Sequence, residues 1–364
     1  MTPVDTTELI APEVLPTGRE EAWRFTPFDR LNGLVSADTS IAAAPPWQVS
    51  ASDDVELEWI TGLGGARPLP EGVDLAARRA WEFAGGAQII RIRQSLNVPE
   101  TIQVVSNGVG GVVASELRVI AEPNSKAVVV IEHFGFGTHT DNVVVEVGAG
   151  ADLTVVSVQS WDSTAVHLAT HSLTLAQGSH LRHCVVTLGG DLVRIAPHVR
   201  FTGPGAEVEL LGLFFATNGQ HQEHRLRIEH SAPHCTSEVV YKGALRGSKT
   251  HTVWIGDVLI QPQAVGTKTY ELNRNLVLGG GARADSVPNL EILTGEVVGA
   301  GHASATGRFD DEQLFYLQSR GIPSAEARRL VVRGFFADLL GRLNLPDLED
   351  RLLATLDAEL ETDS

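Results

Sequence analysis

The feature that most constrains the fold is a repeat of about 27 residues in the middle of the chain. Similar short segments begin at Asn124, Gly150, Gly178, Gly205 and Pro233, so that successive starts are 26, 28, 27 and 28 residues apart. Each segment opens with turn-forming residues and continues into a short apolar run, which is typical of a β-strand. Evenly spaced units of this kind predict the stacked coils of a β-solenoid.

A second strand is predicted between successive starts. In residues 225–229, Leu226 and Ile228 alternate with charged residues, which is the period-2 pattern of a strand with one solvated face. An antiparallel sandwich also contains short strands and turns, but it does not require coils of equal length, so we favour the solenoid. We expect equivalent second strands, one in each of the earlier repeats, at 142–147, 172–175 and 199–201.

The segments on either side of the repeat have a different character. Residues 20–23 are consistent with the end of a short helix, residues 38–54 with a linker, and residues 71–86 with a helix. After Phe309 apolar residues recur at helical spacing, and Asp310 is a suitable N-cap. We therefore expect a mainly β protein whose helical ends cover the two ends of the stack. The expected parts are an N-terminal arm and mixed region (1–87), a parallel β-helix core (88–309) and a C-terminal helical domain (310–364).

Composition excludes several classes of function. The formal net charge of -17 argues against nucleic-acid binding, which needs a basic surface. The chain has two cysteines and no Cys-x-x-Cys motif, so a disulfide framework is not expected. Neither a secretory signal nor an apolar run of about 18 residues is visible, so we expect a soluble, cytoplasmic protein without a membrane partner.

Three blocks of sequence carry more specific information. They are the arm Glu21-Ala-Trp-Arg-Phe-Thr-Pro, the block Asn273-Arg-Asn-Leu followed by Ala284-Asp-Ser-Val-Pro-Asn-Leu-Glu-Ile, and the tail Asp311-Glu-Gln-Leu-Phe-Tyr-Leu-Gln-Ser-Arg-Gly-Ile-Pro. Together they resemble the SufB/SufD family of iron–sulfur cluster assembly proteins, over most of the chain and most strongly from about 234 to 342. Within that family, the lone His302 and the Trp-Arg-Phe-Thr-Pro arm resemble SufD rather than SufB.

The resemblance implies a fold and a set of partners. The fold would be a right-handed parallel β-helix flanked by helical segments. The partners would be SufB, in a heterodimer through the β-helix, and the ATPase SufC, with sulfide supplied by a cysteine desulfurase system. The resemblance also implies a transient iron–sulfur cluster at the subunit interface and, in the complex, reduced flavin, for which we find no specific motif.

Two residues are candidate metal ligands. The resemblance aligns His302 with a family histidine that is implicated, with a cysteine of SufB, in cluster formation. Imidazole is a competent iron ligand, although an ordinary interface hydrogen bond would equally explain the histidine. Ala300 stands where many relatives carry a cysteine, so no thiolate comes from that position. Cys235 is the second candidate, but a lone strand cysteine, like Cys184, is more often a small buried hydrophobe.

Two further groups of polar residues have simpler interpretations. His221, Glu223 and His224 form a ligand-rich cluster, for which we favour a solvated turn over a metal site. The C-terminal helices match the family region that docks SufC, and the residues expected there are Glu312, Phe315, Tyr316, Arg320, Arg333 and Phe335.

Three functions compete at this point. A non-catalytic scaffold for iron–sulfur assembly fits best, and the chain alone could form a homodimer. A β-helix polysaccharide lyase or hydrolase is the alternative, although only 6% of residues are aromatic and such enzymes usually expose aromatic rows. A solenoid acyltransferase is disfavoured because its hexapeptide period is absent. Gly279–Gly281 lacks the Lys-Ser/Thr of a phosphate-binding loop, so no nucleotide is expected to bind this chain.

Overall fold

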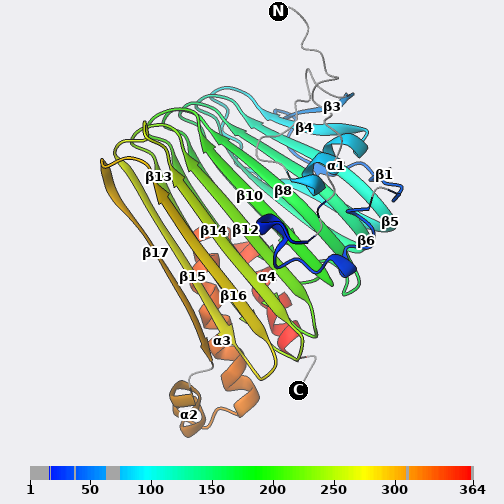
Figure 1. Ribbon diagram of the computed structural model, residues 1–364, viewed down its shortest axis with the longest axis vertical. Helices are drawn as coiled ribbons and strands as arrows, with labels where there is room; N and C mark the ends of the chain where they lie inside the picture. Colours follow the sequence, from blue (N-terminus) through cyan, green and yellow to red (C-terminus); the bar gives the residue numbers. More distant parts are fainter. Residues whose placement is uncertain (1–15, 17, 37, 63–73, 309–310, 362–364) are drawn as a thin grey trace, which may run out of the picture.

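The chain folds into a β-solenoid of about 8 turns, with helices near its two ends in sequence (Figure 1). The computed structural model describes residues 16, 18–36, 38–62, 74–308 and 311–361. Strands make up 52% of the chain, and the expected mainly β, parallel fold is confirmed.

The strands alternate between two faces of the stack. Two long strands, β5 (Ile102–Ala121) and β6 (Lys126–Val147), begin it, and each runs along both faces, because the first half of β6 pairs with β7 and its second half with β8. The first face then contains β7 (Asp152–Gln159), β9 (His180–Thr187), β11 (Glu207–Ala216), β13 (Thr236–Leu245), β15 (Thr267–Val277) and β17 (Val297–Arg308). The second contains β8 (Val166–Leu175), β10 (Leu192–Phe201), β12 (His221–His230), β14 (His251–Ile260) and β16 (Arg283–Ile292).

Neighbouring coils pair in parallel and in register. Asp152 lies beside His180, His180 beside Glu207, and Glu207 beside Thr236, so equivalent positions of successive coils stack on one another. This pairing excludes the antiparallel sandwich for these strands. The predicted second strands are also confirmed, as residues of β6, β8, β10 and β12.

The turn before each strand explains the sequence repeat. Asn124, Gly150, Gly178 and Gly205 all have positive φ, between 59° and 69°, and the N–H of each donates to a carbonyl of the turn in the next coil. Glycine and asparagine are the residues that adopt this left-handed conformation at least cost. His234 occupies the same position with φ 59°, which accounts for the irregular Pro-His start of the last repeat.

The interior of the stack is largely aliphatic. Valine, leucine and isoleucine side chains from successive coils form one continuous cluster, in which Val129, Val155, Leu181, Leu210 and Val239 are fully buried. A single coil could not enclose these side chains, so each depends on the coils beside it. Parallel stacking is therefore what gives the repeat a hydrophobic core.

The N-terminal region packs on the first coils and along the second face as far as β12. It contains two short 3-10 turns, strands and one helix, and Asp74 caps that helix by accepting from the Ala77 N–H (3.1 Å). The elements are η2 (Glu21–Trp23), η3 (Phe28–Arg30), β1 (Ala42–Ala43), β2 (Gln48–Ser50), β3 (Glu56–Thr61), α1 (Leu75–Phe83) and β4 (Gly86–Ile92). The short helix near residue 23 and the helix within 71–86 agree with expectation.

The predicted linker at 38–54 is wrong. This segment supplies β1 and β2, both of which pair with β5. Between them the Trp47 side chain is buried and donates from Nε1 to the Glu116 carbonyl oxygen (3.2 Å). Proline and alanine content suggested a linker, whereas strand pairing and the buried indole decide the structure.

The C-terminal helices do not cover an end of the stack, contrary to expectation. The elements are α2 (Asp311–Ser319), α3 (Ser324–Leu340), η4 (Gly341–Leu343) and α4 (Pro346–Glu361). Phe336 and Leu339 of α3 and Leu352 of α4 pack on the outer surface of the first face, against residues such as Val186 and Leu213. The outward side chains of these strands are apolar, so the lateral face needs a cover and the helices provide it.

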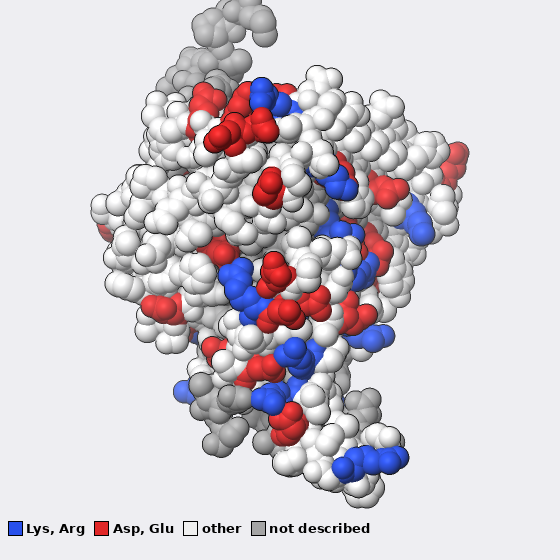
Figure 2. Space-filling model, turned by 180° about the vertical axis from the view of Figure 1, so that it is seen from behind, with Lys and Arg blue, Asp and Glu red and all other residues white. Residues whose placement is uncertain are grey.

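Ion pairs join these helices to the strands beneath them. Lys242 on β13 pairs with Asp338, Arg342 with Glu209, and Arg351 with Glu132. On the face seen in Figure 2, basic and acidic side chains alternate rather than gather into one patch of a single sign.

No helix of the described residues is long and apolar enough to cross a membrane.

The last coil is left open. Strand β17 pairs with β15, and β16 pairs with β14; no other pairing of β16 or β17 is found among the described residues. Their outer edges therefore present unpaired backbone groups. Val298 is 73% exposed and Leu293 48% exposed, so apolar surface accompanies these edges.

Candidate functional site

His302 lies on this open coil. It belongs to β17, its side chain is exposed, and its register partner on β15 is Glu271. Residues in register on parallel strands point to the same side of the sheet. Because Glu271 points into the solenoid, His302 occupies the inner side of the last coil, which is exposed because no further coil covers it.

Glu271 is an unusual residue for the interior of the solenoid. Its side chain is 1% exposed, and neither carboxylate oxygen has a hydrogen-bond partner. Burial, with a smaller contribution from Asp257, raises the pKa of this carboxyl group from 4.5 to about 8. The space around it is tight, since a Cβ at Gly256 would lie 2.4 Å from Oε1. Glu271 was not predicted as a site residue from the sequence. The pattern that could have identified it is the alternation along β15, in which Glu271 occupies an inward position, as residues 269, 273 and 275 do.

A polar network fixes the strands around this site. The Asn273 Oδ1 atom accepts from Asn275 Nδ2 (2.9 Å) and from Ser286 Oγ (2.7 Å). Asn275 Nδ2 also donates to Thr306 Oγ1 (3.2 Å), and Ser304 Oγ donates to Asn273 (3.4 Å). These bonds join β15, β16 and β17, so the Asn273-Arg-Asn motif holds the open coil in place.

The two cysteines do not reach His302. Cys235 is fully buried, and its Sγ atom lies 3.4 Å from the Gly203 carbonyl oxygen. It precedes β13, two strands from β17, and strand geometry separates its backbone from that of His302 by roughly 15 Å. Cys184 is buried on the other side of the sheet, beneath the C-terminal helices. Burial raises the pKa of both thiols, so neither is a ready thiolate ligand.

The open coil therefore offers part of a ligand set. His302 supplies an accessible imidazole, and Glu271 supplies a carboxyl group one strand below it. Both are suitable iron ligands, whereas the thiolates that usually hold iron–sulfur clusters are absent from this position.

The candidate docking helix α2 has two exposed aromatic side chains. Phe315 is 72% exposed and Tyr316 57% exposed, and the Arg320 guanidinium lies 5.3 Å from the Tyr316 ring centroid. Leu314, on the opposite side of the helix, is buried. The exposed aromatic pair is available to a partner. The side chain of Glu312 lies outside the described residues.

Two of the predicted docking residues instead connect parts of this chain. Arg333 on α3 forms an ion pair with Asp357 on α4 (2.5 Å). Phe335 is half-buried against the solenoid, where its ring lies 5.3 Å from the Lys242 ammonium group. Phe315, Tyr316 and Arg320 are thus exposed on α2, whereas Arg333 and Phe335 make contacts within this chain.

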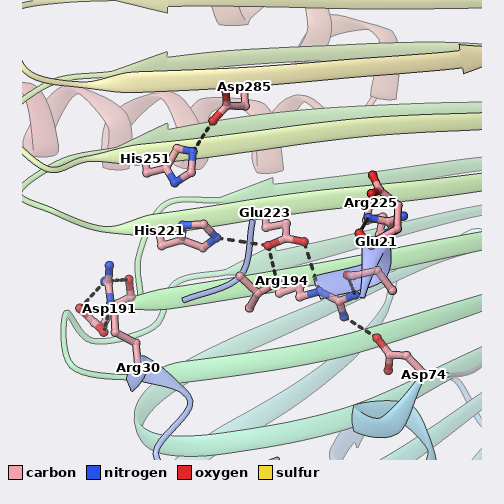
Figure 3. Close-up of polar contacts among 12 residues, drawn as sticks. Glu21, Arg30, Asp74, Asp191, Arg194, His221, Glu223, Arg225, His251 and Asp285 are labelled. Carbon is pink, nitrogen blue, oxygen red and sulfur yellow. Dashed lines mark hydrogen bonds and ion pairs between the residues drawn. The ribbon is translucent and has the colours of Figure 1, made fainter. Parts of the chain in front are cut away.

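A buried ion network holds the N-terminal arm on the second face (Figure 3). Arg194 on β10 lies 2.6 Å from Asp74 and 3.3 Å from Glu223, and its guanidinium stacks on the Trp23 ring at 4.3 Å. Thr26 of the arm donates to Glu223 Oε2 (2.8 Å). The Trp-Arg-Phe-Thr-Pro motif is therefore an anchor, with Trp23 and Thr26 as its buried contacts.

The interpretation of His221, Glu223 and His224 as a solvated turn is wrong. All three are buried on β12. His221 Nε2 bonds to Glu223 Oε2 (3.2 Å), and His224 bonds to Thr187 and stacks on Phe214. Burial raises the pKa of Glu223, but hydrogen bonds from His221 and the charge of Arg194 outweigh it and lower the pKa to about 2.

Comparison with known proteins places this architecture in a family. The model of the SUF system FeS cluster assembly SufBD core domain matches residues 104–335, which includes the whole stack from β6 to β17 and much of α3. The chain belongs to the SufBD family. The match includes Glu271, His302 and the Asn273 motif, and it also includes α2.

Named relatives extend the SufBD match to 95% of the chain. An iron-sulfur cluster assembly SufBD family protein of Mycobacterium tuberculosis is 49% identical over 95% of this chain and 90% of its own length. A SufBD family protein of Mycobacterium leprae is 48% identical over 95% of the chain and 91% of its own length. The iron-sulfur cluster assembly protein SufD of Escherichia coli is 26% identical over 95% and 89%.

Proposed function

We propose that this SufBD-family chain is the SufD-type scaffold subunit of an iron–sulfur cluster assembly complex, without catalytic activity of its own. The SufD assignment is supported by the similarity to the Escherichia coli protein and by the Trp-Arg-Phe-Thr-Pro anchor. The proposed parts are the N-terminal region 1–87, the β-helix core 88–309 and the helical domain 310–364. No observation favours the polysaccharide lyase or hydrolase.

The observation that carries the proposal is the position of His302 on an open solenoid end. The same open end has unpaired strand edges and the exposed side chains of Val298 and Leu293. A second solenoid, which we identify as SufB, would pair with these edges and place its own ligands opposite His302. The nascent cluster would then form only in the assembled heterodimer, and it would be cargo that is handed on. Without SufB, the same edges would favour a homodimer.

The second partner would be the ATPase SufC, bound at α2. The exposed Phe315 and Tyr316 side chains support this, because aromatic residues often dominate protein interfaces. ATP hydrolysis would take place in SufC, with sulfide arriving from a cysteine desulfurase system. Reduced flavin would belong to the assembled complex.

Anaerobic reconstitution tests the role of His302. The chain would be combined with SufB and SufC, iron and sulfide, and iron–sulfur absorbance would be compared for wild type, His302→Ala and His234→Asn. His234 is an exposed histidine in a left-handed turn that asparagine tolerates, which makes it a matched control. We expect His302→Ala to lower the cluster yield several-fold and His234→Asn to leave it unchanged.

Two results would contradict this proposal. Full cluster yield with His302→Ala would reduce the histidine to an interface residue. A chromophore of equal intensity in the chain alone and in the complex would exclude a site that is shared between subunits. Light scattering of the isolated chain tests the homodimer separately.

A further inference from the structure

A second group of potential metal ligands lies at the opposite end of the solenoid. His133 and Asp141 of β6 and His167 of β8 bring one ligand atom each to within 4.8 Å of one another. His133 Nε2 lies 3.1 Å, and His167 Nε2 3.0 Å, from Asp141 Oδ2. Both imidazoles are fully buried and Asp141 is 2% exposed. The second carboxylate oxygen, Asp141 Oδ1, has no hydrogen-bond partner.

The neighbouring Gln159 determines which nitrogen of His167 carries a proton. Trp161 Nε1, which can only donate, lies 2.8 Å from Gln159 Oε1, so this atom is the amide oxygen. His167 Nδ1 lies 2.7 Å from the same oxygen and must therefore carry a proton. If the ring is neutral, its Nε2 atom has a lone pair.

That lone pair faces the Asp141 carboxylate. Two acceptors 3.0 Å apart repel each other unless a proton, carried by either group, or a metal ion lies between them. The unpartnered Asp141 Oδ1 atom adds a free ligand at the same place.

The spacing of the ligand atoms agrees with metal coordination. Ligands about 2.1 Å from a metal ion and at right angles to each other lie about 3.0 Å apart. We propose that His133, Asp141 and His167 bind a divalent first-row transition metal ion, Fe²⁺ or Zn²⁺, as a two-histidine, one-carboxylate site. Gln159 acts as the outer partner that orients His167 through its Nδ1–H.

One adjustment accompanies binding. His133 Nδ1 accepts from Gln159 Nε2 (3.2 Å), so its proton is on Nε2 in the metal-free protein. Ligation through Nε2 moves that proton to Nδ1 and breaks this contact, while Gln159 Nε2 keeps its bond to Ser157 Oγ (2.9 Å). The ring remains neutral throughout.

This site is independent of the proposed cluster site. His133 on β6 is separated from β17 by five intervening strands of the first face, so His302 lies roughly 29 Å from it along the stack. The site is enclosed by the rings of Trp47 and Trp161. Metal would enter during folding, before the first coils close over it.

The test measures metal content after refolding. Wild-type chain would be refolded anaerobically with Fe²⁺, Zn²⁺ or Mg²⁺, freed of excess metal and analysed by elemental mass spectrometry. Asp141→Asn and His167→Gln would be compared with His183→Gln, a matched control in which a buried His171–His183 pair (2.9 Å) lacks a carboxylate. His302→Ala separates this site from the open end.

We expect about one equivalent of Fe²⁺ or Zn²⁺ per chain in wild type, His183→Gln and His302→Ala. No Mg²⁺ should be retained. Asp141→Asn and His167→Gln should each retain at least tenfold less metal than wild type. Co²⁺-loaded wild type, which does not depend on how the variants fold, should show ligand-field bands of nitrogen and oxygen coordination. Absence of these bands, or equal metal in the site variants and the controls, would overturn the proposal. So would a His167 imidazolium seen by ¹⁵N NMR in a wild-type protein that takes up no metal.

Discussion

Glu271 on β15 and His302 on β17 are register partners on the inner side of the last solenoid coils. One is a buried carboxyl group without a hydrogen bond, and the other is an exposed imidazole. A buried acid in this condition lowers the stability of the isolated chain, because ionisation in the folded state is disfavoured.

Glu271→Gln should change the pH dependence of stability. The folded-state pKa of about 8 lies above the ordinary 4.5, so the folded wild type holds a proton that the unfolded chain loses between these values. Wild-type stability should therefore fall as pH rises from 4.5 to 8, by up to roughly 5 kcal/mol, and the variant should lack this decrease. Urea unfolding at pH 5 and pH 8 measures the difference.

The control for that experiment is Glu291→Gln on β16, where the side chain is exposed. It should follow the wild-type pH profile. If Glu271→Gln also follows that profile, the carboxyl group is not held neutral in the folded protein.

Arg194→Met should loosen the N-terminal arm. The substitution keeps an apolar stem beside Trp23 but leaves Asp74 and Glu223 without their cation. Removing one partner of a buried ion network typically costs about 3–5 kcal/mol. Unfolding free energy should fall by this amount, and limited proteolysis should cut the arm faster. Arg24→Met, at a pair whose side chains are 63% and 71% exposed, should change stability by less than about 1 kcal/mol. Equal effects of the two variants would contradict the role of Arg194 in holding the N-terminal arm on the second face.

Phe336→Ala should detach α3 from the solenoid. The ring is fully buried between the helix and the outer side of the first face, and such truncations cost about 3–5 kcal/mol. Thermal unfolding and hydrogen exchange of α3 and α4 would report the loss. A variant as stable as wild type would show that the helices are held mainly by their ion pairs.

Phe315→Ala, unlike Phe336→Ala, should leave stability almost unchanged and should weaken the binding of a partner. Because the ring is 72% exposed, stability should change by no more than about 0.5 kcal/mol. If α2 docks SufC, affinity for that subunit should fall at least about tenfold, measured by titration calorimetry. Unchanged affinity would place the docking surface elsewhere.

Both cysteines should resist alkylation in the native protein. Cys184 and Cys235 are fully buried, and burial raises the pKa of each thiol, so iodoacetamide should label neither at pH 8 within the time that labels both in urea. Mass spectrometry counts the labelled sites. Rapid native labelling of Cys235 would restore it as a candidate ligand.

The repeat was predictable because its cause is local. Left-handed turns at Gly150, Gly178 and Gly205 leave a glycine signature at even spacing, and the strands that follow carry the expected apolar residues. The linker expectation for 38–54 failed because the polar and proline residues of the segment concealed the burial of Trp47. His221 and Glu223 were misassigned for a similar reason, since a buried ion network looks hydrophilic in sequence.

Periodicity predicted the solenoid, its coil length and the helical tail, and the family resemblance pointed to His302, because these features are visible in short stretches of sequence. The positions of the helices, the open last coil and the meeting of distant polar groups became visible only in the folded structure. Glu271 lies in register with His302, and Asp141 contacts His167, only because successive coils stack in register. Contacts one coil apart depend on strand pairing, and pairing is a property of the folded stack rather than of any local segment.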